Sequence, residues 1–205
     1  VVVKSTVPVG TAERVAGIIG EAKREGAEFD VVANPEFLRE GEGLFNFLWP
    51  DRIVIGTRSE RARRIMRALY QPIITRRVPW PPRMADASAD PVPVVETDLA
   101  SAQMIKYASN AFLATRIAFI DEIAWLCEEA GADVKDVALG MGYDPRIGHS
   151  YLQAGLGFGG PCLEKDLRAL VNHRERGGGG DRLLAAVLEH NEDQIARVVA
   201  RVRDL

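Results

Sequence analysis

Short apolar runs alternate with helix-like patterns over the first third of the chain, and this alternation most constrains the fold. Residues 1–3, 29–33 and 52–56 are rich in valine and isoleucine, as buried strands are. Residues 11–25 and 59–70 follow the first and third of these runs, and their apolar side chains recur at helical spacing. Strands that alternate with helices predict a parallel sheet covered by helices.

The predicted sheet has few strands. Even with a fourth short strand at 94–95, it falls short of a whole doubly wound domain. We therefore expect residues 1–96 to form the C-terminal part of a doubly wound parallel sheet, that is, a partial Rossmann-type domain whose first half is missing. Five prolines between residues 75 and 93 predict an irregular excursion before the last strand.

Residues 97–205 are predicted to form an all-helical domain. The helical pattern runs from 97 to 130, about three times the mean helix length, which suits a spine shared between subunits. Shorter helices are expected at 132–139 and 184–205, and the glycines at 177–180 predict a flexible break.

Composition excludes several classes of function. The chain has 205 residues and a formal net charge of −3, which gives no electrostatic reason to expect nucleic acid or a membrane surface as a partner. No apolar run reaches the ~20 residues of a membrane-spanning helix. Two cysteines in different surroundings argue against a disulfide framework and favour a reducing cytoplasm. Three scattered histidines, and no cysteine pair at ligand spacing, predict no metal site.

A glycine-rich loop precedes a candidate nucleophile in the stretch 155–166. Pro161 suits the first turn of a helix, and Cys162 follows in that turn, where unpaired N–H groups favour a thiolate. Asp166 lies one turn further on. Cys127, by contrast, lies among apolar residues and is expected to be a packing residue. The glycines match a dinucleotide fingerprint, but no strand precedes them, so we reject that interpretation. The stretch is a candidate reaction centre.

Further polar residues are candidates for the same chemistry. Lys106 and Asn110 are four residues apart in a helix with few other polar side chains, so we expect Lys106 to be buried, as an oxyanion stabiliser would be. Glu36 and Thr6 each follow a predicted strand, at the sheet edge where doubly wound folds bind ligands. Glu40 comes four residues after Glu36. Taken singly, each is equally compatible with an ordinary surface side chain.

Six segments together resemble the UDP-glucose 6-dehydrogenase family, in the family's order and over nearly the whole chain. The resemblance implies an enzyme that oxidises the C6 alcohol of UDP-glucose to a carboxylate in two NAD-dependent steps. It also implies a homodimer formed through helix 97–130. The six segments are Lys4–Gly10, Asn34–Gly41, Asp51–Gly56, Lys106–Leu113, Asp144–Gly148 and Gly157–Asp166.

The resemblance further implies a role for each candidate residue. Cys162 would hold the sugar as a thiohemiacetal and then as a thioester. Lys106 and Asn110 would stabilise oxyanions, and Asp166 and Glu36 would handle protons and the attacking water.

Contacts with cofactor and substrate are implied in the same way. Thr6, which would also assist catalysis, would contact NAD together with Glu40 and Lys165. Arg146 would reach into the site of the neighbouring subunit. The implied contacts with the nucleotide sugar are Glu36, Phe37, Leu38, Arg39, Lys106, Asn110, Arg146, Tyr151, Leu152, Gln153 and Gly159.

Two alternatives stay open. GDP-mannose 6-dehydrogenases share the cysteine loop and the lysine helix, and a non-catalytic dimerisation core is also compatible with the sequence. The family begins with a glycine-rich turn that binds the NAD pyrophosphate and ends with a third domain. The 205-residue sequence carries neither of these parts, so we expect it to bind NAD weakly and to be inactive alone. Pro161 and Glu164 also differ from the residues common in the family.

Overall fold

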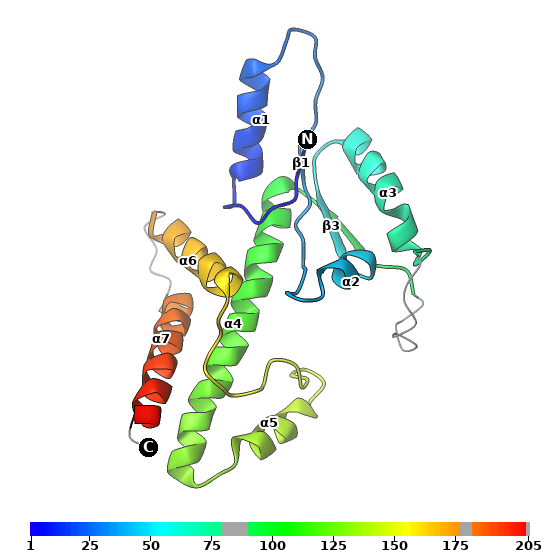
Figure 1. The fold of residues 1–205 in the computed structure, drawn as a ribbon. Helices are drawn as coiled ribbons and strands as arrows, with labels where there is room; N and C mark the ends of the chain where they lie inside the picture. The colour runs from blue at the N-terminus through cyan, green and yellow to red at the C-terminus, as the bar shows by residue number, and fades with distance from the viewer. Residues whose placement is uncertain (79–89, 177–181, 204–205) are drawn as a thin grey trace. The chain divides into compact units, whose positions relative to one another are not determined.

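The chain forms two compact units, Val1–Lys106 and Tyr107–Leu205. The computed structural model describes residues 1–78, 90–176 and 182–203, and each unit is described by itself (Figure 1). The division between the units falls inside one long helix. The domain boundary at 96/97 inferred from the sequence stays a prediction.

Two sequence-based expectations fall largely or wholly outside the described residues. Most of the proline-rich excursion lies between residues 79 and 89, and the glycine break lies at 177–180. The stretch 90–93, which is described, leads directly into a strand.

The first unit alternates strands with helices, as the sequence predicts. It also contains a short helix, α2, that the sequence did not predict, because six residues are too few to display a helical period. The elements are β1 (Val2–Val3), α1 (Thr11–Ala22), β2 (Val32–Ala33), α2 (Gly43–Leu48), β3 (Ile53–Gly56), α3 (Glu60–Ile74), β4 (Val94–Thr97) and the start of α4 (Leu99–Ala130).

The four strands make one sheet in the order β1-β2-β3-β4. The pairs β1–β2 and β3–β4 are parallel, so the predicted α/β fold is confirmed, with a sheet that is mainly parallel. The central pair, β2–β3, is antiparallel and rests on one residue pair, Ala33 with Gly56. The Asn34 side chain supplements this minimal ladder, because its Nδ2 donates to the Val54 carbonyl oxygen at 2.7 Å. The sheet therefore departs from a wholly parallel one only at its centre.

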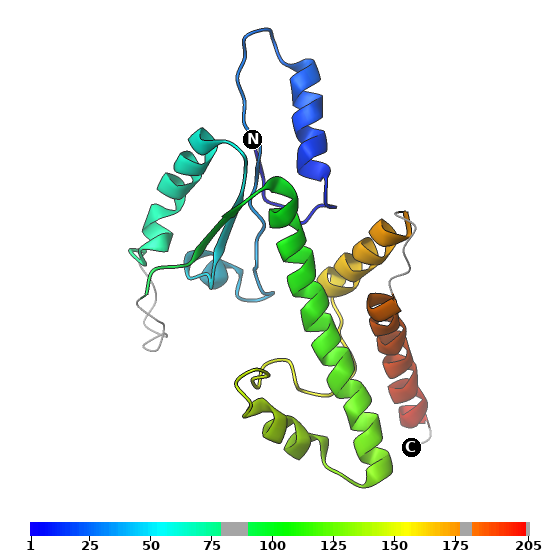
Figure 2. The ribbon, with the colours of Figure 1, turned by 180° about the vertical axis from the view of Figure 1, so that it is seen from behind.

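Successive residues of the buried strands pack on opposite faces of the sheet. Ile53 and Ile55 pack against α3, whereas Val54, between them, packs in a cluster with α1 and the start of α4. Figures 1 and 2 show α1 and α3 on opposite sides of the strands. Because both faces are covered, the strands read as continuous apolar runs rather than as alternating ones.

The second unit is helical, as predicted. It contains the rest of α4, then α5 (Val134–Gly142), α6 (Pro161–Arg176) and α7 (Arg182–Arg203). Small residues of α4, Ala111, Ala114 and Ala118, let α6 and α7 pack closely against it around Leu167 and Leu188. The predicted long helix is confirmed, since α4 runs without interruption for 32 residues.

Within the described residues, no helix combines the length and the apolar character that crossing a membrane requires. The same residues contain no group of three or more His, Cys, Asp or Glu side chains placed to hold a metal ion.

A substitution at Gly56 tests the packing of the sheet on α4. A Cβ there would collide with the Ala102 side chain and lie 2.6 Å from the Asp98 carbonyl oxygen. We expect Gly56→Ala to lower the free energy of unfolding by about 1–3 kcal/mol, measured by urea denaturation followed by circular dichroism.

Gly17→Ala is the matched control. Gly17 lies in α1 with no atom within 4 Å of an added Cβ, so the same change should raise stability by about 0.5–1 kcal/mol. Equal stability of the two variants would contradict the packing described for Gly56.

Candidate active site

A buried cation in the first unit is paired with a carboxylate that follows β2. Lys106 is only 6% exposed, which confirms the predicted burial. Its Nζ lies 3.4 Å from Glu36 Oε1 and 5.4 Å from the centre of the Phe37 ring. A buried ammonium needs such partners, because an unpaired charge removed from water is costly. The structure thus brings together three of the residues chosen from the sequence.

The loop after β2 is held in shape by short polar contacts. Glu36 Oε2 accepts the Leu38 backbone N–H at 2.7 Å, and Asn46 Oδ1 accepts the Arg39 N–H at 2.7 Å. Asn46 lies in α2 and is buried. Sequence reasoning missed this residue, although a polar side chain between Phe45 and Phe47 in a short apolar run was the available signal.

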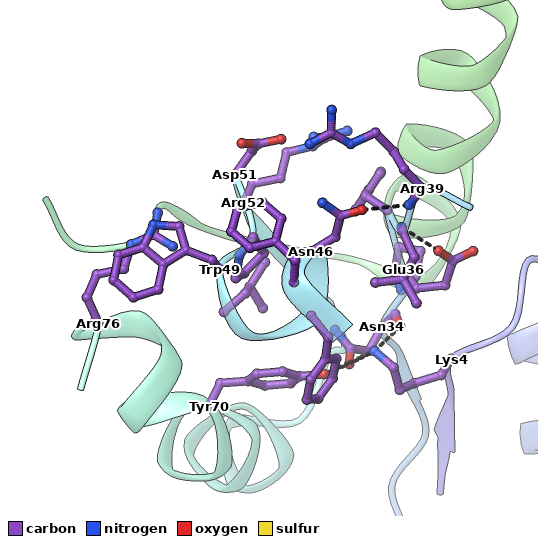
Figure 3. Close-up of a pocket in the computed structure, with 17 residues that line it drawn as sticks. Lys4, Asn34, Glu36, Arg39, Asn46, Trp49, Asp51, Arg52, Tyr70 and Arg76 are labelled. Carbon is purple, nitrogen blue, oxygen red and sulfur yellow. Dashed lines mark hydrogen bonds between the residues drawn. The ribbon is translucent and has the colours of Figure 1, made fainter. Parts of the chain in front are cut away.

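The same loop borders a cavity of about 300 Å³, drawn in Figure 3. Guanidinium groups stack on aromatic rings along its wall: Arg52 lies 3.8 Å from the ring centre of Phe37, and Arg76 lies 4.6 Å from that of Trp49. On the opposite side, the Lys4 ammonium donates to Asn34 Oδ1 at 3.1 Å. The cavity therefore combines positive charge with aromatic surface. Glu36, Phe37, Leu38 and Arg39 are the predicted substrate residues that line it.

Two predicted cofactor residues, Thr6 and Glu40, lie in connecting segments of the first unit. Thr6 is half-buried in the segment that follows β1, and Glu40 is exposed in the turn before α2. Among the described residues, neither side chain makes a hydrogen bond or ion pair with Glu36 or Lys106.

In the second unit, Cys162 is exposed in the first turn of α6, where the sequence places it. One turn further on, Asp166 is only 1% exposed. Asn110 Nδ2, from α4, donates to Asp166 Oδ2 at 2.7 Å, and Lys165 Nζ donates to Oδ1 at 2.7 Å. Both oxygens of the buried carboxylate are thus occupied. The structure brings Asn110, Lys165 and Asp166 together, one turn from the thiol.

This carboxylate changes the titration of its neighbours. Its hydrogen bond to Lys165 raises the pKa of that ammonium. Burial, and then the negative charge of Asp166, raise the pKa of the Tyr107 phenol, so that the ring stays neutral. Lys165 and Tyr107 therefore both keep their protons beside this carboxylate.

The remaining predicted substrate residues are spread along the connection between α5 and α6. The Arg146 guanidinium is exposed and is held by Asp144, with Nη2 2.6 Å from Oδ2. Leu152 is buried, and it borders a cavity of about 370 Å³ together with Gln153. Tyr151 is exposed in a left-handed backbone conformation with φ 59°, and Gly159 is also exposed. Among the described residues, no hydrogen bond or ion pair links any of these side chains to Cys162 or Asp166.

Comparison with known proteins follows the same division. The NAD binding domain of the UDP-glucose/GDP-mannose dehydrogenase family matches residues 1–74, and the central domain of that family matches residues 100–193. Solved structures of nucleotide-sugar dehydrogenases share this order of an α/β unit and a helical unit. The chain belongs to the UDP-glucose/GDP-mannose dehydrogenase family.

Individual relatives agree with this assignment. UDP-glucose 6-dehydrogenase TuaD of Bacillus subtilis is 45% identical over 98% of this chain, which spans 40% of that relative's length. A UDP-glucose dehydrogenase structure from Pyrobaculum islandicum is 40% identical, with a TM-score of 0.79 over 93% of this chain and 40% of that one. A GDP-mannose dehydrogenase structure from Pseudomonas aeruginosa is 27% identical, with a TM-score of 0.56 over 100% of this chain and 44% of that one.

The two cysteines should differ in reactivity. Cys162 is exposed at a helix N-terminus, whereas Cys127 is buried in α4. We expect iodoacetamide to modify Cys162 at least about tenfold faster in the native protein, measured by peptide mass spectrometry. In denaturant the two should react alike. Equal rates in the native protein would contradict the different surroundings described for the two thiols.

Proposed function

We propose that this protein is an NAD-dependent UDP-glucose 6-dehydrogenase that converts the C6 alcohol of the sugar to a carboxylate. The observation that carries the proposal is the exposed Cys162 thiol at the start of α6, one turn from the buried Asp166. An alcohol taken to an acid loses four electrons in two steps, and the intermediate aldehyde must be held between them. A thiolate does this well, because it adds to aldehydes and forms thioesters.

The proposed reaction at Cys162 converts the intermediate aldehyde to the acid through two covalent intermediates. After the first oxidation, the Cys162 sulfur adds to the C6 aldehyde carbon and gives a thiohemiacetal. Removal of a second hydride from C6, and of the hydroxyl proton, leaves a thioester. Water then attacks the thioester carbonyl, the carbon–sulfur bond breaks, and the products are the carboxylate and the free thiol. Asp166, with Asn110 bound to it, is proposed to accept the proton of the attacking water.

Charge on the C6 oxygen develops in each of these steps. We propose that Lys106 stabilises it, since a lysine with little access to water exerts a strong field. Its ion pair with Glu36 supports this assignment, because the carboxylate offsets the cost of burying the ammonium group. Asn110 is proposed as a second oxyanion stabiliser and Glu36 as a proton acceptor.

NAD, when bound, supplies the electron acceptor for both oxidations. Thr6 fits a contact with it, because this half-buried hydroxyl follows β1 at the strand end where doubly wound folds bind nucleotides. Glu40, exposed in the turn before α2, and Lys165 are proposed as further contacts.

The choice of UDP-glucose over GDP-mannose as the substrate rests on sequence identity to the relatives. The UDP-glucose dehydrogenases named above are 45% and 40% identical to this chain, whereas the GDP-mannose dehydrogenase is 27% identical. Residues 36–39, 146 and 151–153, with Gly159, are proposed to contact the nucleotide sugar. A cytoplasmic location is also proposed, because both cysteines are free thiols.

We propose that the protein forms a homodimer through α4. Three large apolar side chains of the second unit lie seven residues apart on this helix and are exposed: Phe112 by 62%, Phe119 by 44% and Leu126 by 54%. A seven-residue spacing puts them on one face, as in paired helices. Such a stripe is typical of an interface. The exposed Arg146 fits the proposed contact with a neighbouring subunit's site.

The role of Cys162 can be tested by Cys162→Ser in the full-length protein. The variant should keep the fold and the binding of UDP-glucose, because serine is nearly the same size. It should form little or no UDP-glucuronate over many turnovers, measured by coupled NADH absorbance and product chromatography. Cys127→Ser should keep near-normal turnover. Full conversion by Cys162→Ser at a near-normal rate would overturn the proposed function.

The dimer is tested by Phe119→Asp, which places a charge in the middle of the exposed stripe. Light scattering should give a dimeric mass for the unmodified protein and a monomeric mass for the variant, since a buried unpaired carboxylate is costly. Glu122→Asp, on the same helix, should remain dimeric. A monomeric mass for the unmodified protein at tens of micromolar would contradict the proposal.

A further inference from the structure

The glycine loop that leads into α6 has little rigidity of its own. Gly157 and Gly160 adopt left-handed φ values of 86° and 78°, and residues 155, 156, 159 and 160 are exposed. Yet α6 begins at Pro161, immediately after the loop. Whatever fixes Phe158, the buried residue within this loop, therefore fixes the start of the helix that carries Cys162.

Phe158 is held by its side chain and by its backbone. The ring is 4% exposed and packs in the core cluster that contains Leu167 and Leu188. Asn191 of α7 engages both backbone groups: its Oδ1 accepts the Phe158 N–H at 2.7 Å, and its Nδ2 donates to the Phe158 carbonyl oxygen at 3.1 Å. A Cβ at Gly157 would collide with the same Oδ1, so the loop backbone lies directly against the amide.

A second set of contacts secures the loop at its other end. Asp121, which is fully buried, accepts the Gly155 N–H on Oδ1 at 2.7 Å, and Gln194 donates to the Gly155 carbonyl oxygen. Gln194 also accepts the Trp125 indole N–H at 2.6 Å. Asn191 and Gln194, three residues apart on α7, thus turn one buried polar face toward the loop.

We propose that Asn191 is a positioning residue for Cys162: its amide fixes the Phe158 peptide on α7 and so sets the start of α6 and the surroundings of the thiol. The proposal rests on the proposed function, in which that thiol is the nucleophile. Buried polar side chains are costly unless they are hydrogen-bonded, so the burial of Asn191 is explained by the Phe158 backbone groups that it binds.

Two substitutions separate the hydrogen bonds from side-chain volume. Asn191→Leu has nearly the same shape and no polar atoms. Asn191→Asp keeps the acceptor but, when ionised, sets a carboxylate against the Phe158 carbonyl. Once protonated, its carboxylic acid can accept and donate as the amide does. Asn172→Leu and Asn172→Asp, at an exposed position of α6, are the matched controls.

The readout is the rate at which iodoacetamide alkylates Cys162 in the full-length protein, expressed as a ratio to the unmodified protein at the same pH. We expect a ratio about threefold to tenfold below one for Asn191→Leu, because a disordered helix start loses its favourable interaction with the thiolate. For Asn191→Asp we expect a low ratio near pH 8 that rises toward one near pH 5, since burial raises a carboxyl pKa. Circular dichroism checks that each variant is folded.

The controls should stay within twofold of one at every pH, on the order of experimental scatter. Ratios at or above one for folded Asn191→Leu, or no recovery of Asn191→Asp on acidification, would overturn the positioning role. Alkylation needs neither cofactor nor sugar. Failure of this proposal is therefore distinguishable from failure of the proposed function, which the turnover of Cys162→Ser decides.

Discussion

The buried Asp166 carboxylate is the constraint on which the helical unit depends. A carboxylate removed from water without partners costs several kcal/mol, so α6 is stable only where both oxygens are bound. Asn110 supplies one partner from α4, and Lys165 supplies the other from α6 itself. The hydrogen bond from Asn110 and the packing of Leu167 together orient α6 against α4. Cys162, one turn earlier, lies in the first turn of the helix, where its thiol is accessible.

In the α/β unit the buried charge is positive, and it is likewise paired. Lys106 is buried, and Glu36 meets it because β2 ends just before the loop that carries the carboxylate. The loop is then shaped by its own hydrogen bonds, including the one from the Arg39 backbone to Asn46. In each unit a buried charged side chain is bonded to a polar side chain from a distant segment of the chain: Lys106 to Glu36, and Asp166 to Asn110. Polar side chains that are costly to bury thus constrain the arrangement in addition to the apolar core.

Much of the fold and of the candidate site could be predicted from the sequence, and the features that could not be predicted have physical reasons. The strand–helix alternation, the long helix and the helix start at Pro161 follow from local periodicity and proline geometry, and all three are present. The burial of Lys106 followed from its apolar neighbours. Periodicity does not encode the direction in which β2 and β3 pair, because a two-residue strand gives no register signal. It also does not reveal which polar side chains on distant helices meet the glycine loop. Asn191 occupies a position in the apolar repeat of α7, but only the fold shows that it meets Phe158.

The proposed function requires that Cys162 holds the sugar covalently during the second oxidation. The most direct measurement is acid-quenched peptide mass spectrometry of the full-length protein during turnover with UDP-glucose and NAD. We expect a transient adduct with the mass of the uronyl thioester on the peptide that contains Cys162. The adduct should decay as UDP-glucuronate accumulates, and the Cys127 peptide should stay unmodified. Steady formation of UDP-glucuronate with no adduct on Cys162 at any quench time, under conditions that preserve an authentic thioester, would contradict the account.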